Sequence, residues 1–178
     1  PDHPVMRRGA AWLVGQEVRV RGDWAVRRPN LEPSGWAFEF ENDNYPDIDD
    51  TAEVVMALRA SQGAVEPSIR RALDWVFGMQ CKGGGFAAFD VDNTSALCGE
   101  LPFCDFGEVI DPPSADVTGH VIEMLAEEGL ADDPRTRAAR EWLLRQQEPD
   151  GSWFGRWGAN YVYGTGAAVP GLVRAGIA

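Results

Sequence analysis

The sequence predicts an all-α protein, a partial α/α toroid in which inner and outer helices alternate around a cavity and long ordered loops connect them. Apolar residues recur with helical spacing along most of the 178 residues. The predicted helices alternate between an amphipathic kind and an almost wholly apolar kind, and one motif repeats along the chain. Because neighbouring units of such an array cover each other's apolar faces, we expect one outer and one inner helix in each unit.

Three segments are of the amphipathic kind, residues 7–16, 67–77 and 133–147. In the second segment the apolar residues lie at positions i, i+4, i+7 and i+8, and charged residues take the other face. These apolar residues are Ile69, Leu73, Val76 and Phe77. Since such a helix keeps one side in water, we predict that these three helices lie on the outside.

Three further segments are apolar nearly all round, residues 51–58, 117–126 and 165–173. A Thr followed by a small residue stands at or next to the start of each, as Thr51-Ala52, Thr118-Gly119 and Thr165-Gly166. A helix without a polar face must be covered on every side, so we predict that these are the inner helices.

The repeated motif is a Gln at the end of each predicted outer helix, followed by Gly-x-aromatic. The glutamines are 64 and 66 residues apart, and the three units are Gln16 with Trp24, Gln80 with Phe86, and Gln146 with Trp153. The loops 30–46 and 80–114 are long and rich in aromatic residues. Loops of this length are usually functional or disordered, and the aromatic residues argue against disorder. We expect both loops to fold over one mouth of the ring.

Charge and composition exclude several classes of protein. Sixteen Lys and Arg against 28 Asp and Glu give a net charge of −12, which disfavours binding to nucleic acid or to anionic membrane surfaces. No apolar run approaches the ~20 residues of a membrane span. The three cysteines, Cys81, Cys98 and Cys104, are too few for a disulfide framework and are expected to be free thiols in a reducing cytoplasm. With two histidines in the chain, we expect no zinc site or other metal site.

The two ends suggest an internal piece of a longer protein. The chain opens at Pro1 without an initiator Met or a signal peptide, and it closes within a predicted helix.

Three carboxylates, Asp47, Asp49 and Asp50, stand where the first inner helix is predicted to begin. One Asp there is explained as a helix N-cap. Three are not, because carboxylates crowded in a partly buried site repel one another and raise at least one pKa. The Asp-x-Asp-x-Thr pattern of phosphoaspartyl phosphatases needs a preceding apolar strand, which is missing, and a Mg²⁺–diphosphate site lacks nearby cationic groups. Brønsted acid chemistry is the interpretation of the three carboxylates that remains.

A partner for this acid stands on the next inner helix. Asp116 and His120 are at positions i and i+4, where neighbouring side chains can touch, and a carboxylate beside an imidazole favours its protonated form. The alternative is a buried structural His with Asp116 as an N-cap, and the residues alone do not decide between the two.

Aromatic residues are concentrated in the loops and at loop–helix junctions. A cavity walled with rings stabilises positive charge, although many of the rings could equally be core. The residues are Trp36, Phe38, Phe40, Tyr45, Phe86, Phe89, Phe103, Phe106, Trp157, Tyr161 and Tyr163.

These motifs together resemble the squalene-hopene cyclases. Residues 47–52 resemble the DxDDTA acid motif of that family, the three Gln…Gly-x-aromatic units resemble its QW repeats, and the stretches 101–108, 111–120 and 150–158 complete the match. The resemblance implies that residues 1–178 are a fragment of the catalytic α/α-barrel domain, of the (α/α)₆ type, of a longer cyclase.

The resemblance also implies roles for single residues. Asp49 would donate a proton to the terminal double bond of squalene, Asp47 and Asp50 would flank it, His120 would hydrogen-bond Asp49, and Asp116 would orient His120. Tyr163 would join a water network behind the acid. Phe38 would stabilise cations, with Trp36, Tyr45, Phe89 and Trp157 beside it along the cavity, and Phe103 and Cys104 would lie at the substrate entrance.

The implied activity is the proton-initiated cyclisation of squalene to hopene or hopanol without any cofactor. The family are monotopic enzymes on the cytoplasmic side of the bacterial membrane, so membrane contact is expected through sequence outside this chain, and a homodimer is possible. The nearest alternatives are another class II terpene cyclase acting on a shorter or different isoprenoid, since such enzymes share DxDD, and a non-catalytic α/α-toroid binding module.

Overall fold

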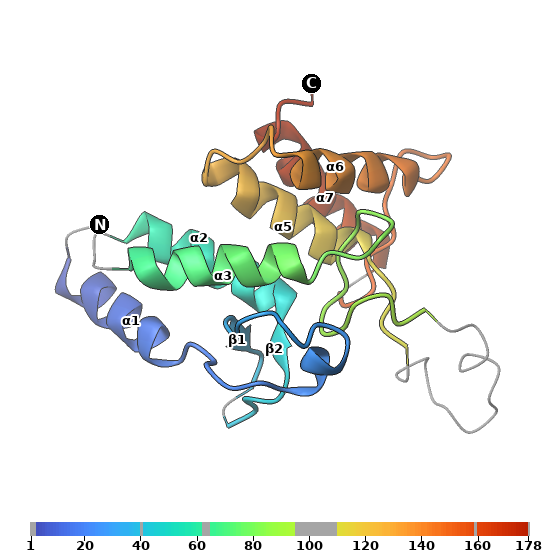
Figure 1. The fold of residues 1–178 in the computed structure, drawn as a ribbon. Helices are drawn as coiled ribbons and strands as arrows, with labels where there is room; N and C mark the ends of the chain where they lie inside the picture. Colours follow the sequence, from blue (N-terminus) through green and yellow to red (C-terminus); the bar gives the residue numbers. More distant parts are fainter. Residues whose placement is uncertain (1–2, 40, 62–64, 95–109, 159, 178) are drawn as a thin grey trace.

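The computed structural model describes residues 3–39, 41–61, 65–94, 110–158 and 160–177 (Figure 1). Six α-helices and a short two-stranded antiparallel pair, with one 3₁₀ turn at Asp23–Val26, make up the regular structure of these residues. The helices are α1 (Pro4–Gly15), α2 (Ile48–Ala60), α3 (Glu66–Gly78), α5 (Ala115–Glu127), α6 (Pro134–Arg145) and α7 (Asn160–Arg174), and the strands are β1 (Trp36–Ala37) and β2 (Pro46–Asp47). All six predicted helices are therefore confirmed, and the strand pair is an addition that the sequence pattern did not predict.

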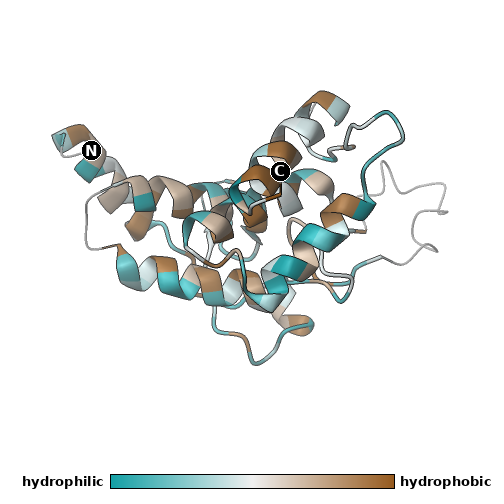
Figure 2. Ribbon diagram, turned by 90° about the horizontal axis from the view of Figure 1, so that it is seen from above, coloured by the Kyte–Doolittle hydropathy of each residue, from teal (hydrophilic) through white to brown (hydrophobic). Residues whose placement is uncertain are grey.

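Inner and outer helices alternate along the chain, as the hydropathy pattern predicted. Helices α2, α5 and α7 lie side by side as the inner row, while α1 and α3 pack on α2 and α6 packs on α5. Helix α5 buries most of its length, whereas α3 and α6, at the lower edge of Figure 2, mix hydrophilic and hydrophobic residues along one helix. No helix among the described residues is long and apolar enough to cross a membrane.

Small residues bring α5 and α7 into close contact. A Cβ atom added at Gly119 would lie 2.6 Å from the carbonyl oxygen of Ala167, and one added at Gly171 would lie 2.3 Å from that of Gly119. Both distances are shorter than a van der Waals contact, so these two positions accept only glycine without a shift of backbone. Of the small residues that follow an inner-helix Thr, Gly119 thus lies at a close contact between inner helices, whereas a Cβ atom added at Gly166 would meet nothing within 4 Å.

Each inner helix is tied to the aromatic residue of its unit by the hydroxyl group of its Thr. The hydroxyl oxygens of Thr51, Thr118 and Thr165 accept the backbone N–H of Trp36, Phe86 and Trp153, each at 3.0 Å. The aromatic residue of the first unit is therefore Trp36, and the prediction of Trp24 is wrong. The reason is an insertion: Val18 pairs with Gly35 as Cys81 pairs with Gly85, so residues 19–34 bulge out between the paired positions. Trp24 packs edge-to-face on Trp75 within this bulge.

The structure also identifies which residue occupies the glutamine position of each repeat unit. The side-chain amide of Gln80 donates to the carbonyls of Gly84 and Arg135, and that of Gln147 donates to Gly151. The motif glutamine of the third unit is thus Gln147, one residue after the predicted Gln146. In the first unit Glu17 stands at this position, where it binds Ser34 and Arg71, so the prediction of Gln16 is wrong too.

One side of α7 is not covered. Val162 and Val173 are 83% and 62% exposed, and Tyr161 and Val169 are also exposed. The expectation that every inner helix is covered on all sides holds for α5 but not for α7, because no described segment packs against this side.

Candidate active site

Asp47 begins the inner helix α2 and caps it. Its carboxylate accepts the backbone N–H of Asp49 at 2.7 Å and of Asp50 at 3.2 Å, and its own carbonyl accepts the hydroxyl of Thr51 at 2.6 Å. The short strand β2 pairs Asp47 with Trp36 of β1, which fixes where the helix starts. The N-cap interpretation therefore describes one of the three carboxylates, and Asp49 and Asp50 remain available to the cavity.

Asp49 is the second residue of α2 and meets His120 of α5. The Nδ1 atom of His120 is 2.7 Å from Oδ1 of Asp49, and both side chains are mostly buried. Burial opposes a charge on the imidazole, but the hydrogen bond to Asp49 and the charges of Asp49, Glu53 and Glu123 outweigh it and raise the pKa of His120. The structure thus joins the two residues that the resemblance placed together and favours an imidazolium that donates to Oδ1 of Asp49.

The carboxyls beside Asp49 have raised pKa values. Burial and the charge of Asp50, against two backbone hydrogen bonds, raise the pKa of Asp47 to about 7. Burial and the charges of Asp49 and Glu53 raise the pKa of Asp50. Burial is the largest cause of both shifts and the neighbouring carboxylates add to it, so at least one carboxyl pKa is raised as predicted, with crowding as the smaller cause.

Glu53 is a site residue that the sequence reasoning missed. Its carboxylate lines the cavity and lies 3.7 Å from Nδ1 of His120, one helical turn after Asp49. Burial raises its pKa, His120 lowers it, and Asp49 raises it further. The signal was available, because Glu53 is the one charged residue within the apolar run 51–58.

The acid pair opens into a cavity of about 590 Å³. Phe89 and Trp157 form part of its wall and meet edge-to-face with ring centroids 5.7 Å apart. Tyr163 lies edge-on to His120 at 6.1 Å, and burial together with the charge of Asp49 raises its pKa to about 12, so its hydroxyl stays protonated. The lining residues are Phe38, Asp47, Asp49, Asp50, Glu53, Phe89, His120, Trp157 and Tyr163.

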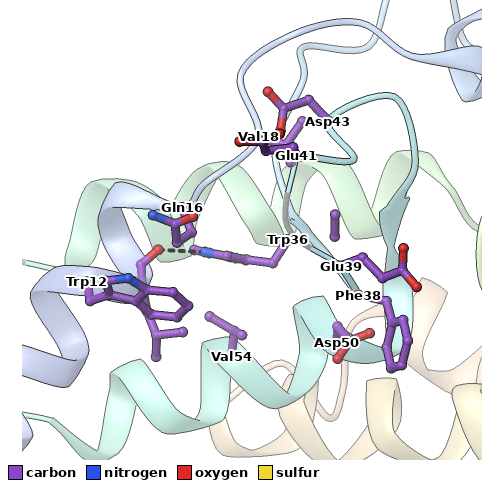
Figure 3. A pocket seen from close by; sticks show the side chains of 12 residues that line it. Trp12, Gln16, Val18, Trp36, Phe38, Glu39, Glu41, Asp43, Asp50 and Val54 are labelled. Carbon is purple, nitrogen blue, oxygen red and sulfur yellow. Dashed lines mark hydrogen bonds between the residues drawn. The ribbon is translucent and has the colours of Figure 1, made fainter.

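Trp36 does not line this cavity, which corrects the expectation for it. Its ring is buried against α1 and lines a second pocket of about 130 Å³, which shares Phe38 and Asp50 with the acid cavity (Figure 3). Its indole N–H donates to the carbonyl of Leu13 at 2.7 Å, just as the indole of Trp153 donates to Leu143 at 2.8 Å. The requirement to satisfy a buried indole N–H at the end of the outer helix directs the ring away from the acid.

Tyr45 is also misplaced by the sequence reasoning. Its hydroxyl donates to Asp23, its side chain is 44% exposed, and it is not among the residues that line the acid cavity. The loop that carries it turns toward the 3₁₀ segment, a contact that no local pattern encodes. Phe103 and Cys104 lie outside the described residues.

Asp116 is buried next to the site but does not contact His120. Its two oxygens accept the backbone N–H of Val117 at 3.1 Å and of Trp157 at 2.9 Å. The predicted i, i+4 contact does not form because a carboxylate at a helix N-terminus is drawn to backbone N–H groups, here those of its own helix and of the loop before α7.

Among the described residues, no group of three or more His, Cys, Asp or Glu is arranged to hold a metal ion. The fold and site define a class of protein: an α/α helical array whose cavity carries a carboxyl–imidazole pair at one end and aromatic rings along its walls. The sequence matches the model of the squalene-hopene cyclase C-terminal domain over residues 1–178, and the chain belongs to this family.

Curated relatives agree with this assignment. A squalene–hopene cyclase of Alicyclobacillus acidocaldarius is 52% identical over 180 residues, which cover 98% of this chain and 28% of that protein. A squalene–hopene cyclase of Zymomonas mobilis is 48% identical over 91% of this chain and 26% of its own length. A dammaradiene synthase of Dryopteris crassirhizoma is 41% identical over 97% of this chain and 27% of its own length. The chain thus spans little more than a quarter of the length of these relatives.

Proposed function

We propose that residues 1–178 form part of the catalytic α/α-barrel domain of a longer enzyme that cyclises squalene to a hopanoid, hopene or hopanol. The observation that carries the proposal is the Asp49–His120 pair, 2.7 Å apart, at the end of a cavity with aromatic walls. Relatives that are 52% and 48% identical bear the name squalene–hopene cyclase.

Asp49 is the proton donor in this proposal. A carboxyl whose Oδ1 is held by His120 keeps Oδ2 for the proton, which passes to the terminal double bond of squalene. The π electrons of that bond form the new C–H bond and leave a tertiary cation, which the next double bond attacks. The imidazolium of His120 stabilises the carboxylate that remains. Asp47 and Asp50 flank the donor, and the raised pKa of Asp47, about 7, limits the negative charge beside it.

The aromatic wall serves the cations that follow. The rings of Phe38, Phe89 and Trp157 face the same cavity as the acid, and a well-placed ring is worth ~0.5 to 2 kcal/mol to a desolvated cation. Loss of a proton at the last cation gives hopene, and capture of water gives hopanol. No cofactor enters these steps.

The rest of the enzyme lies in sequence beyond this chain. We propose that further helices cover the exposed side of α7 and close the cavity, and that other parts supply membrane contact on the cytoplasmic side of a bacterial membrane, from which an apolar substrate such as squalene enters. Homodimer formation would also depend on those parts.

Asp49→Asn in the complete protein tests the proposal. The amide keeps the shape of the side chain and loses the acidic proton, so we expect squalene consumption to fall by at least ~10³-fold. Products are identified by gas chromatography with mass spectrometry after incubation with squalene, and geranylgeranyl diphosphate is offered in parallel. Full activity of the variant, or turnover of the diphosphate alone, would contradict the proposal.

A further inference from the structure

Two buried carboxylates near the cavity take no part in the proposed chemistry. Asp111 is 7% exposed and Asp116 is fully buried, and neither lines the cavity. Burying a carboxylate is costly unless hydrogen bonds compensate for the lost water, so the partners of each indicate what it does.

Asp116 is hydrogen-bonded to a residue of the aromatic wall. Its Oδ2 accepts the backbone N–H of Trp157 at 2.9 Å, across 41 residues of sequence. Trp157 lies in the segment between α6 and α7, where no helix or strand supplies this N–H with a partner. A hydrogen bond to a charged acceptor is roughly twice as strong as one between neutral groups, and here it anchors the residue whose ring lines the cavity.

Asp111 likewise anchors the adjacent ring of the wall, that of Phe89. Its Oδ2 accepts the backbone N–H groups of Phe89 at 2.6 Å and Asp90 at 2.8 Å, and its Oδ1 lies 3.4 Å from that of Ala88. Phe89 also lies in a loop without regular hydrogen bonds of its own. The two anchored rings then meet each other edge-to-face at 5.7 Å.

We propose that Asp116 is a positioning residue for the aromatic wall, acting through Trp157, with Asp111 as its counterpart for Phe89. This inference rests on the proposed function, because a ring affects the products only if cations pass it. It replaces the role of orienting His120, since the oxygens of Asp116 are bonded to the N–H groups of Val117 and Trp157. Asp116 therefore governs how far cyclisation proceeds, and Asp49 with His120 governs whether it starts.

The experiment compares variants of the complete protein, with products from squalene resolved by mass spectrometry and squalene consumption followed separately. Asp116→Ala removes the acceptor, so we expect a roughly tenfold rise in the ratio of partly to fully cyclised products, as in Trp157→Ala. Asp116→Asn retains an acceptor oxygen and should restore most of the product ratio, with squalene consumption reduced less than tenfold. Asp133→Ala, which removes the N-cap of α6 away from the cavity, controls for general loosening and should leave the ratio unchanged.

Two results would overturn the inference. One is an Asp116→Asn variant that loses squalene consumption as completely as His120→Ala while its few products keep the normal ratio. That behaviour is expected of a residue that acts by orienting His120. The other is a double variant, Asp116→Ala with Trp157→Ala, whose product shifts add fully, because a residue acting through Trp157 adds little once the ring is gone. If Asp116→Ala fails to fold, Asp116→Asn still decides whether Asp116 positions the aromatic wall or orients His120. Neither result touches the test of Asp49, so the two proposals fail separately.

Discussion

Three aspartates within four positions of the sequence have three different environments in this site. Asp47 is bound by backbone N–H groups, Asp49 by an imidazole, and Asp50 faces the cavity beside them. Chemical identity therefore does not assign the roles of these residues. The positions of the nearest hydrogen-bond donors assign these roles, and the donors belong to the first turn of α2 and to the neighbouring helix α5.

The site makes the stability of the protein depend on pH. The pKa of Asp47 is raised to about 7 and that of His120 is also raised, so each binds its proton more tightly in the folded protein than in the unfolded chain. Their stabilising contribution is full below the unfolded pKa and is lost as the pH rises through the folded pKa. We expect the free energy of unfolding of the complete protein to fall by about 1 kcal/mol between pH 6 and pH 8.

Urea titrations at these two pH values measure the change, and Asp47→Asn is the matched variant. Asn still caps a helix but does not titrate, so the fall should become smaller. An identical fall in both proteins would show that Asp47 is not responsible.

At the scale of elements, side chains of inner helices organise their neighbours. Thr118 holds the aromatic residue of its unit through a backbone hydrogen bond, and Gly119, the next residue, lets α7 approach α5. One dipeptide therefore fixes both a loop and a helix–helix distance. The role of the Thr hydroxyl recurs at Thr51 and Thr165, whereas the close approach at the following residue is specific to Gly119, since an added Cβ at Gly166 would meet nothing within 4 Å.

Gly119→Ala tests the close approach. The new Cβ would stand 2.6 Å from the carbonyl of Ala167, a backbone atom that cannot yield easily, so we expect a loss of about 1 to 3 kcal/mol of stability. Gly9→Ala in α1 is the control, because nothing lies within 4 Å of the added Cβ and alanine favours helix by ~1 kcal/mol. Chemical denaturation of both variants gives the comparison, and equal effects would argue against a tight α5–α7 contact.

At the scale of the whole molecule, the acid site is only partly enclosed. Phe38 is 73% exposed and Trp157 is 49% exposed, although both line the cavity, and the apolar side of α7 faces water. An enzyme that carries cations must exclude water, since water captures them. The proposed cyclisation therefore requires more enclosure than the described residues supply.

We therefore expect the 178-residue chain alone not to cyclise squalene. The purified chain is incubated with squalene in detergent, its helix content is checked by circular dichroism, and products are sought by mass spectrometry. Cyclised products from a folded chain would show that the missing segments are dispensable for catalysis.

The sequence by itself determined the six helices, their inner and outer order, and the crowding of carboxyls at the start of α2. These features are local, because apolar periodicity and capping residues act within one or two turns. Tertiary structure alone decided that Trp36 turns to α1 and Tyr45 to Asp23, that Glu53 joins His120, and that Asp116 binds the loop of Trp157. Each of these contacts joins residues from separate segments of the chain. Their partners depend on the bulge at 19–34 and on the path of the loops, where no periodic pattern records which N–H or imidazole will be nearest.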